Sequence, residues 1–295
     1  MKVSILLPVF NEEKYLHQAI ESILNQSYTN WELIIIDNCS TDETLSISNR
    51  YKDKDSRINV FSIPEKGMVK AYNYGFTKCS GDIICYLSGD DILPRSSLEI
   101  RALPIINNPS KSIFTTCLLK TFSKEKKFNG NTYPKNFNKP NYSAGSLMFK
   151  KEIADKIFPI PIELPNEDVW TSLHLKAFCE NIHIPKVLHN YRIHSNNTYG
   201  YNMKFQEKKT KFIRRMSAYN IFLKKYIKID FDNREYFEQY NDFVVYLKKS
   251  KFPFFLLLTK NKLSFSEKLK FLMYSSKGLF WLRYKFFNFF SGLSN

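Results

Sequence analysis

Apolar residues in the first hundred positions form short continuous runs, separated by segments in which they recur at helical spacing. The runs cover residues 2–10, 32–37, 58–63 and 82–87. Runs of this length, rich in Val, Ile and Leu, are typical of strands that are buried on both faces. Because such strands alternate here with helical segments, the pattern predicts an α/β fold with a mostly parallel central sheet flanked by helices.

The segments between these strands carry helix start signals. Leu16, Ile20 and Ile23 lie at helical spacing, and Asn11 is expected to cap that helix. The Ser-Thr-Asp cluster at residues 40–42 is expected to start the helix after the second strand. A third helix is expected around residues 68–79.

The pattern changes twice further along the chain. From residue 100 to about 200 it is less regular, with a helix expected over 166–178 and a strand over 186–194. Beyond residue 205, Lys, Phe, Leu and Tyr dominate and turn residues are sparse, so helices are expected. The sequence therefore predicts an α/β domain over residues 1–204 and a helical C-terminal extension over residues 205–295.

Composition narrows the class of protein. The chain has 295 residues, of which 43% are hydrophobic, and this apolar content excludes intrinsic disorder. Its five cysteines form no CxxC pair, which favours reduced thiols in a reducing compartment. No stretch reaches the ~18 to 20 apolar residues of a spanning helix, the strongest being residues 252–258. With a poor secretory signal at the N-terminus, the sequence predicts a cytoplasmic protein without a spanning segment.

Charge is concentrated near the C-terminus. The formal net charge is +16, and residues 201–295 hold 20 Lys and Arg against 7 Asp and Glu. In the same region an apolar stripe is bordered by lysines, and it comprises Phe265, Leu269, Leu272, Leu279 and Phe286. Such a helix suits the surface of an anionic membrane, and packing against the rest of the protein is the alternative. No nucleic-acid-binding module is recognisable, so we expect no nucleic acid partner.

Carboxylates follow the apolar strands. Asp37 ends the second run, Asp90 and Asp91 follow the fourth, and Glu167 and Asp168 precede an apolar helical segment. An open parallel sheet binds its ligand at the carboxyl ends of its strands. Each of these residues alone could be an ordinary turn or cap residue, but together they predict a site at one edge of the sheet.

Longer motifs resemble a known family. They are VSILLPVFNEEKYL at the N-terminus, SILNQSYTNWELIIIDNCSTDET, the K-G-x-x-x-A-x-N-x-G run at residues 66–75, and SGDIICYLSGDD at residues 80–91. SAGSLMFKK, NEDVW and YRIH follow. In order and spacing these segments, which span about two-thirds of the chain, resemble the inverting nucleotide-sugar glycosyltransferases of family 2, which have the GT-A fold.

The resemblance implies a nucleotide-sugar site over residues 1–100 and an acceptor site over residues 101–204. Asp37 would accept a hydrogen bond from the base, beside Asn38, where many members have a second Asp. This substitution leaves the identity of the base open, because an amide both donates and accepts. The other residues implied at the donor site are Pro8, Phe10, Asn11, Glu12, Lys70, Asp90 and Gly145.

The resemblance also implies a divalent metal, Mg²⁺ or Mn²⁺. The family's D-x-D-D motif appears here as Ser-Gly-Asp-Asp at residues 88–91, so the first carboxylate is missing. Asp90 matches the residue that contacts the metal, and His194 matches a histidine that adds a ligand in several relatives. A cation of this kind would neutralise charge on the departing diphosphate.

For the reaction itself, the resemblance implies that Asp168 is the catalytic base and that Glu167 orients the acceptor or its loop. The expected activity is transfer of a sugar, from UDP-hexose or UDP-N-acetylhexosamine, to a hydroxyl of a lipid-linked oligosaccharide for capsule or O-antigen. We expect the enzyme to lie on the inner face of the cell membrane as a peripheral protein. The alternatives are a polyprenyl-phosphate sugar synthase and a non-catalytic module that binds membrane or nucleic acid.

Overall fold

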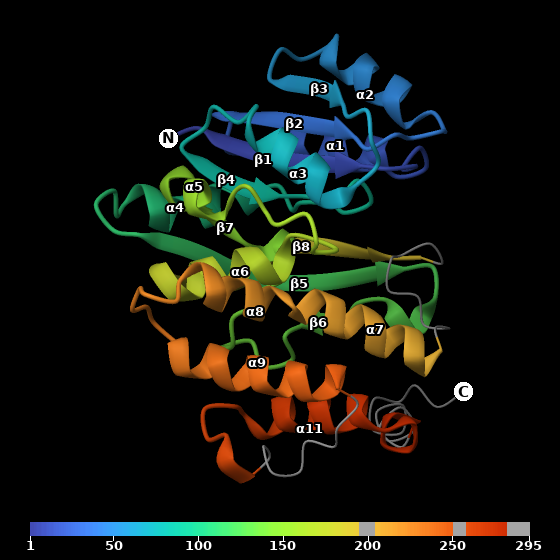
Figure 1. Ribbon diagram of the computed structural model, residues 1–295. Coiled ribbons are helices and arrows are strands. Elements are labelled where there is room, and N and C mark those ends of the chain that lie inside the picture. Colours follow the sequence, from blue (N-terminus) through green and yellow to red (C-terminus); the bar gives the residue numbers. More distant parts are fainter. Residues whose placement is uncertain (195–203, 250–257, 282–295) are drawn as a thin grey trace. The chain divides into compact units, whose positions relative to one another are not determined.

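The computed structural model describes residues 1–194, 204–249 and 258–281, and the chain divides into two compact units, Met1–Ser195 and Asn196–Asn295 (Figure 1). Two features expected near the C-terminus lie partly outside the described residues. They are the apolar run, at residues 252–257, and the stripe, at Phe286.

The first unit is built on an eight-stranded sheet in the order β3-β2-β1-β4-β7-β5-β6, with β8 paired to β5. Its strands are β1 (Val3–Val9), β2 (Trp31–Asp37), β3 (Ile58–Ser62), β4 (Ile83–Tyr86), β5 (Ile113–Ser123), β6 (Thr132–Tyr133), β7 (Met148–Lys150) and β8 (Glu180–Ile193). The first four are mutually parallel, and β5 and β8 are parallel, whereas β7 runs antiparallel to both β4 and β5. The expected α/β class with a mostly parallel sheet is confirmed.

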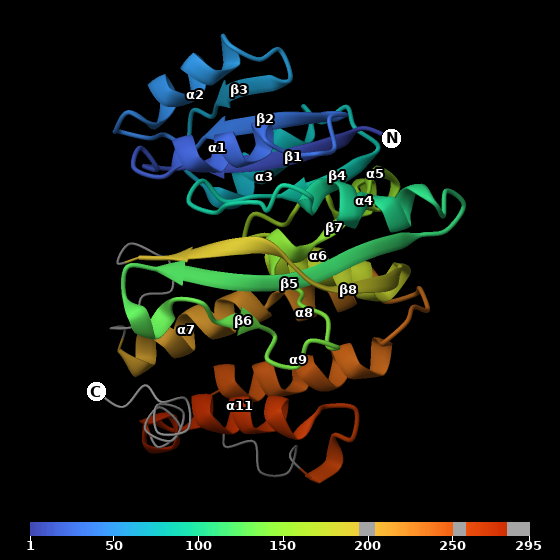
Figure 2. The same cartoon turned by 180° about the vertical axis from the view of Figure 1, so that it is seen from behind.

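Helices cover both faces of this sheet. They are α1 (Leu16–Leu24), α2 (Thr44–Lys52), α3 (Met68–Phe76), α4 (Ser97–Ile106), α5 (Lys151–Ile157) and α6 (Asp168–Phe178). The apolar residues of α1 and α4 share one core cluster with the odd-numbered residues of β1. The opposite face receives α3, which lies in front of the sheet in Figure 1, whereas α1 is in front in Figure 2. A Cβ atom at Gly75 of α3 would lie 2.8 Å from Leu6, so glycine allows this close approach.

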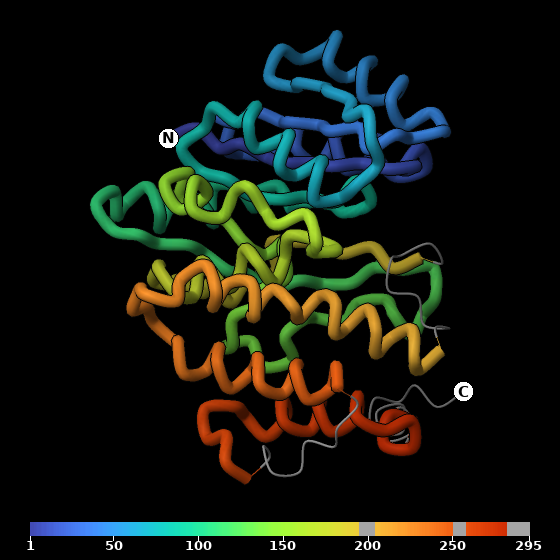
Figure 3. The backbone as a smooth tube through the Cα atoms, viewed as in Figure 1, coloured from blue at the N-terminus to red at the C-terminus, as the bar shows by residue number. Residues whose placement is uncertain are grey.

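Two distant segments meet in β5 and β8. Their pairing runs from Ile113 beside Glu180 to Ser123 beside Ile193, and the tube in Figure 3 shows the two strands side by side. The expected strand at residues 186–194 forms the second half of β8, which begins earlier, at Glu180. Because β5 and β8 are parallel, their carboxyl ends lie together, and His194 follows directly after this end.

The expected caps are partly wrong. Helix α1 begins at Leu16 with Tyr15 at its N-cap, and Asn11 adopts a left-handed backbone conformation with φ 54°. The Asn11 side chain bonds Thr41 instead, its Oδ1 accepting from the Thr41 N–H at 2.8 Å. Asp42 does accept a hydrogen bond from the N–H of Thr44, the first residue of α2, although Glu43 is the N-cap residue.

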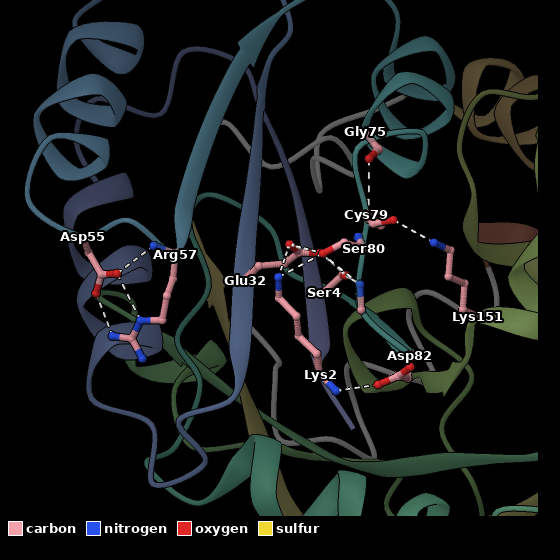
Figure 4. Close-up of polar contacts among 11 residues, drawn as sticks. Lys2, Ser4, Glu32, Asp55, Arg57, Gly75, Cys79, Ser80, Asp82 and Lys151 are labelled. Atoms are coloured by element: carbon pink, nitrogen blue, oxygen red, sulfur yellow. Dashed lines mark hydrogen bonds and ion pairs between the residues drawn. The ribbon is translucent and has the colours of Figure 1, made fainter.

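The amino end of the sheet is closed by a buried carboxylate, Glu32 on β2 (Figure 4). Glu32 accepts hydrogen bonds from Lys2 Nζ at 2.7 Å and Ser4 Oγ at 2.6 Å, and from the N–H groups of Ser80 and Gly81 at 2.6 and 3.1 Å. These donors lower the pKa of Glu32 to about 2 although its burial acts in the opposite direction. The network ties β1 and β2 to the turn before β4.

The second unit is helical, as expected. Its described helices include α7 (Phe205–Met216), α8 (Ala218–Lys225), α9 (Arg234–Lys248) and α11 (Phe265–Ser275). They pack through aromatic rings, with Tyr219 stacked on Tyr240 at 4.2 Å and Phe243 stacked on Phe271 at 4.7 Å. Phe265 of α11 points outward instead, and 80% of its surface is exposed.

No helix within the described residues combines the length and the apolar character needed to cross a membrane. All five cysteines, which lie in the first unit, are free, and Cys79, Cys85 and Cys117 are buried. The expectation of reduced thiols that pack as small apolar side chains agrees with this arrangement.

Candidate active site

The loops after β1 and β2 are bonded to each other at the carboxyl end of the sheet. Besides the contact between Asn11 and Thr41, the Glu12 N–H donates to Thr44 Oγ1 at 2.7 Å. The left-handed conformation of Asn11 turns the chain sharply after β1, so that residues 10–12 lie against the second loop. Pro8 is buried within β1 and Phe10 is half-buried after it.

Asp37 and Asn38 form the floor of this edge, and each is 3% exposed. The Asp37 carboxylate accepts from the Ser40 N–H at 3.3 Å. Asn38 Oδ1 accepts from the N–H of Gly67 at 2.7 Å, which ties the end of β2 to the start of α3. The side chain that departs from the family pattern therefore has a role within the protein.

Two lysines border the same loops. Lys66 Nζ lies 3.2 Å from the centre of the Phe10 ring, which is a cation–π contact. Lys70 is paired with the exposed carboxylate of Glu65. Lys70 was implied to bind the donor, and the structure shows it in an ion pair at the surface.

Asp90 and His194 meet although 104 residues separate them. His194 Nε2 lies 3.0 Å from Asp90 Oδ2, where the turn after β4 meets the end of β8. Burial, and then the charge of Asp91, raise the pKa of Asp90 to about 6, and His194 acts in the opposite direction. The Tyr15 ring lies 4.9 Å from the His194 ring, so α1 also borders this contact.

Glu12 adds a further carboxyl group. Burial raises its pKa to about 8, and the charges of Asp90, Asp91 and Asp42 act in the same direction. Gly89 makes room for it, because a Cβ atom at residue 89 would lie 2.8 Å from Glu12 Cγ. Several acidic groups are therefore crowded at this edge, and such crowding favours a bound cation.

Arg192 completes this region, and our sequence interpretation did not single it out. Its Nε donates to the Asp90 carbonyl at 2.7 Å, and its Nη2 donates to Gln18 Oε1 at 2.6 Å. The guanidinium group also lies 4.4 Å from the centre of the Tyr15 ring. Arg192 belongs to the quoted YRIH motif, so the sequence held a signal for it.

Glu167 and Asp168 lie at the beginning of α6, and both are buried. Glu167 shares a hydrogen bond with Tyr72, whose burial, together with Glu167, raises its pKa well above the usual value. Asp168 Oδ1 accepts from the Val169 N–H at 2.6 Å. Tyr86 at the end of β4 meets Thr171 of α6 at 3.3 Å between hydroxyl oxygens, which places the helix beside the strand that leads to Asp90.

The loop before α6 is held by Asn73 of α3. Asn73 Nδ2 donates to the Ile160 carbonyl at 2.9 Å, and its Oδ1 accepts from the Ile160 N–H at 2.7 Å. Phe76 stacks on Phe158 at 4.2 Å between ring centres. Asn73 is the asparagine of the K-G-x-x-x-A-x-N-x-G run, whose role the sequence alone did not reveal.

Gly145 lies over a buried histidine. A Cβ atom at this position would come within 2.3 Å of His189 Cε1, so the ring itself explains why glycine is needed. Contact of Gly145 with a donor sugar remains an expectation from the family resemblance.

The described side chains suit a divalent cation only in part. Within residues 1–194, 204–249 and 258–281, no group of three or more His, Cys, Asp or Glu is arranged to hold a metal ion. Asp90 and His194, which are in contact, would offer one oxygen and one nitrogen ligand, a donor set that would fit Mn²⁺ or Mg²⁺ if phosphate oxygens completed the coordination.

The implied residues therefore form two groups along the carboxyl side of the sheet. One comprises the loops after β1, β2 and β4 with His194, and the other comprises Glu167 and Asp168, which reach β4 through α6. Lys70 and Gly145 lie at contacts of their own, with Glu65 and His189.

Comparisons with known proteins agree with this architecture. The model of the family described as "Glycosyl transferase family 2" matches residues 4–160. An uncharacterized glycosyltransferase of Haemophilus influenzae is 47% identical over 98 residues, which are 33% of this chain and 39% of that protein. The chain therefore spans well under half the length of that relative.

A longer match is the O-antigen biosynthesis glycosyltransferase WbnJ of Escherichia coli. It is 31% identical over 214 residues, which cover 66% of this chain and 81% of WbnJ. Among solved structures, S. aureus TarS 1–349 in complex with UDP-GlcNAc has a TM-score of 0.62 at 16% identity, with 95% of this chain and 80% of TarS covered. At that identity the match shows a shared fold.

Proposed function

The chain is a glycosyltransferase of family 2, and from this premise we propose that it builds a bacterial surface polysaccharide by transferring a sugar with inversion. The donor is a UDP-hexose or a UDP-N-acetylhexosamine, and the acceptor is a hydroxyl of a lipid-linked oligosaccharide. The similarity to WbnJ supports a role in polysaccharide synthesis, and the polysaccharide that we propose is capsule or O-antigen. The TarS complex, which has the same fold, supports the UDP-sugar.

The single observation that carries this proposal is the contact between Asp90 and His194 at the carboxyl edge of the sheet. Residues from β4 and β8 converge there with Glu12 from the loop after β1. A nucleotide that enters between the β1 and β2 loops, with its base near Asp37, brings its diphosphate to this edge. Pro8, Phe10, Asn11 and Asn38 would surround this nucleotide.

Asp90 and His194 would hold Mg²⁺ or Mn²⁺ together with the diphosphate oxygens. When bound, such a cation neutralises the charge that grows on the leaving diphosphate. Burial first, and then the charge of Asp91, raise the pKa of Asp90 and so disfavour its charged form, and a bound cation would relieve this cost.

Asp168 acts as the general base. The acceptor oxygen forms a bond to the anomeric carbon of the donor while the bond from that carbon to the phosphate oxygen breaks. The proton of the acceptor hydroxyl passes to the Asp168 carboxylate, and the nucleoside diphosphate leaves from the opposite side of the sugar. Glu167, held by Tyr72, orients the acceptor.

A donor panel tests the activity. The protein is incubated with each nucleotide-sugar and a synthetic lipid-linked saccharide, with and without Mn²⁺, and products are identified by mass spectrometry. We expect transfer from a UDP-sugar that depends on the metal, and a product whose anomeric configuration, measured by NMR, is inverted. A product with retained configuration would contradict the proposed displacement.

The acceptor distinguishes the alternative enzyme, a polyprenyl-phosphate sugar synthase. Polyprenyl phosphate offered alone should accept no sugar, since a lipid-linked saccharide hydroxyl is the proposed nucleophile. Transfer to polyprenyl phosphate itself would favour the synthase.

The second unit provides the proposed contact with an anionic membrane on the inner face of the cell membrane. Phe265 and Leu269, one helical turn apart on α11, are 80% and 40% exposed. Lys262 and Lys277, also exposed, lie near the two ends of the helix. Exposed apolar side chains flanked by lysines suit an anionic bilayer surface.

Vesicle binding tests this contact. Phe265→Ser combined with Leu269→Ser should weaken association with phosphatidylglycerol vesicles, and added salt should weaken that of the unchanged protein. Ser266→Ala, an exposed change on the same helix, is the matched control. Equal, salt-insensitive partitioning of all three proteins would contradict the membrane role.

A further inference from the structure

Asp91, beside the proposed metal ligand Asp90, bonds two residues of β8. Its Oδ2 accepts from His189 Nε2 at 2.8 Å, and its Oδ1 accepts from the Arg192 N–H at 2.9 Å. The side chains of His189 and Asp91 are 1% and 3% exposed. One buried carboxylate therefore holds the strand at two points, three residues apart.

Main-chain bonds extend this attachment. Ile92 and Asn190 exchange two hydrogen bonds, at 3.0 and 2.9 Å, and Arg192 Nε donates to the Asp90 carbonyl. The turn at residues 90–92 is thus fixed against residues 189–192 of β8. Asp90 is the first residue of this turn, and His194 lies two residues after Arg192 of β8. The distance between the Asp90 and His194 side chains therefore depends on this attachment.

We infer that Asp91 and His189 are a positioning pair that sets the distance between the Asp90 carboxylate and the His194 imidazole. The inference rests on the proposed function, because that function makes Asp90 and His194 the metal ligands. Asp91 and His189 contact each other, and they would act by holding β8 in register with the turn after β4. Groups outside the ligand set that orient metal ligands change metal affinity 10- to 100-fold when they are lost.

Gly145 supports the inference from the other side of the ring. Its Cα lies so close to His189 that an added Cβ would meet Cε1 at 2.3 Å and both ring nitrogens at 2.8 Å. The turn at residues 144–146 therefore holds the imidazole against Asp91. His189 Nδ1 is buried and has no hydrogen-bond partner among the described residues, so the side-chain hydrogen bond of this ring is the one between Nε2 and Asp91.

Mn²⁺ affinity tests the pair. Binding of Mn²⁺ alone is measured by electron paramagnetic resonance of the free ion, for the full chain and for His189→Leu and His189→Gln. Leucine removes the hydrogen bond to Asp91, whereas the glutamine amide places an N–H near the position of Nε2. We expect at least tenfold weaker Mn²⁺ binding for His189→Leu and a change within about threefold for His189→Gln.

A matched control separates positioning from general stability. Ser4→Ala removes a buried hydrogen bond at the amino end of the sheet and should lower the thermal midpoint without changing Mn²⁺ affinity. If His189→Leu does not fold, Gly145→Ala displaces the ring without removing it and should weaken Mn²⁺ binding in the same way.

Unchanged Mn²⁺ affinity in both His189→Leu and Gly145→Ala would overturn the inference. Asp90→Ala distinguishes that failure from failure of the proposed function. If Asp90→Ala loses Mn²⁺ binding but His189→Leu and Gly145→Ala do not, the proposed metal site is supported and only the positioning pair is rejected. Unchanged binding in Asp90→Ala rejects the metal site and the positioning pair together.

Discussion

The two ends of the central sheet each bury carboxyl groups, and their surroundings are opposite. At the amino end, Glu32 accepts hydrogen bonds from Lys2, Ser4, Ser80 and Gly81, and its pKa falls to about 2. At the carboxyl end, Glu12 and Asp90 lie among other acids, and their pKa values rise to about 8 and about 6. Hydrogen bonds from its own chain lower the pKa of Glu32, whereas burial first, and then neighbouring acids, raise the pKa values of Glu12 and Asp90.

This contrast separates a structural acid from a functional one. A buried charge that is fully hydrogen-bonded stabilises the fold that provides its donors. Buried acids that lie near one another lower the stability of the fold. Such groups are typical of ligand-binding and catalytic sites. The difference gives a basis for predicting how substitutions at the two ends will behave.

The largest effect is expected for the proposed base at the carboxyl end. Asp168→Asn should lower kcat by about 10³-fold, because general-base catalysis contributes 10²- to 10⁴-fold, while binding of the nucleotide-sugar is largely retained. Initial rates and calorimetric donor affinity measure the two quantities. Asp155→Asn, an exposed change on α5, is the control and should leave both unchanged. A rate within threefold of the unchanged protein would remove Asp168 from the mechanism.

Glu32→Gln should have the largest effect on stability, about 2 to 3 kcal/mol at pH 7, because its donors lose a charged acceptor. Since the folded pKa lies below the ordinary value of 4.5, the stabilisation is complete above pH 4.5 and is lost as pH falls toward 2. Urea unfolding at pH 7 and at pH 3 measures both. A variant as stable as the parent at pH 7 would contradict the assignment of Glu32 as a structural acid.

Asn73→Leu should cost about 2 kcal/mol, since it removes two hydrogen bonds to the Ile160 main chain. We also expect a lower kcat, because that loop leads to Glu167 and Asp168, with donor affinity nearly unchanged. Asn49→Leu, an exposed change on α2, serves as the control for both measurements. An equal fold-loss of donor affinity and of kcat would contradict this expectation, because it would show that Asn73 also affects binding of the nucleotide-sugar.

The smallest effect belongs to Glu12→Gln, and its sign is the opposite of that for Glu32→Gln. Because the folded pKa is about 8, folded Glu12 keeps a proton that the unfolded chain releases above pH 4.5, so rising pH destabilises the fold until about pH 8. Because Glu12 is only half-buried, solvent reduces this penalty well below the full linkage value, and glutamine, which removes it, should raise the unfolding free energy at pH 9 by about 1 kcal/mol. Loss of stability at pH 9 would contradict the described crowding.

The first half of the fold was predictable because its strands are continuous apolar runs whose lengths match the sheet. The sequence also predicted helices beyond residue 205, since lysines and aromatic residues there follow one another without turn residues. The start of α1 was wrong because Asn11 bonds Thr41 across two loops, a contact between distant residues that capping rules do not include.

The site was predictable only where residues belong to recognisable motifs. The resemblance implied both Asp90 and His194, and the structure brings their side chains together, while the metal itself stays a prediction. His189 had no signal, because its importance depends on the pairing of β8 with β5 and on its contact with Asp91, 98 residues away. Asn73 had a motif but no visible partner, since Ile160 lies 87 residues further along the chain.

Helix α3 is bonded to the rest of the first unit at its N-cap and at its middle. Its N-cap residue Gly67 donates to Asn38 beside the proposed base pocket, and its Tyr72 and Asn73 hold the segment that leads to Asp168. Helix α3, nine residues long, therefore joins the proposed base pocket to the segment that carries the proposed catalytic base. Under the proposed roles, a tilt of α3 that admits a bulkier base would also move Asp168, so donor preference and turnover would be linked.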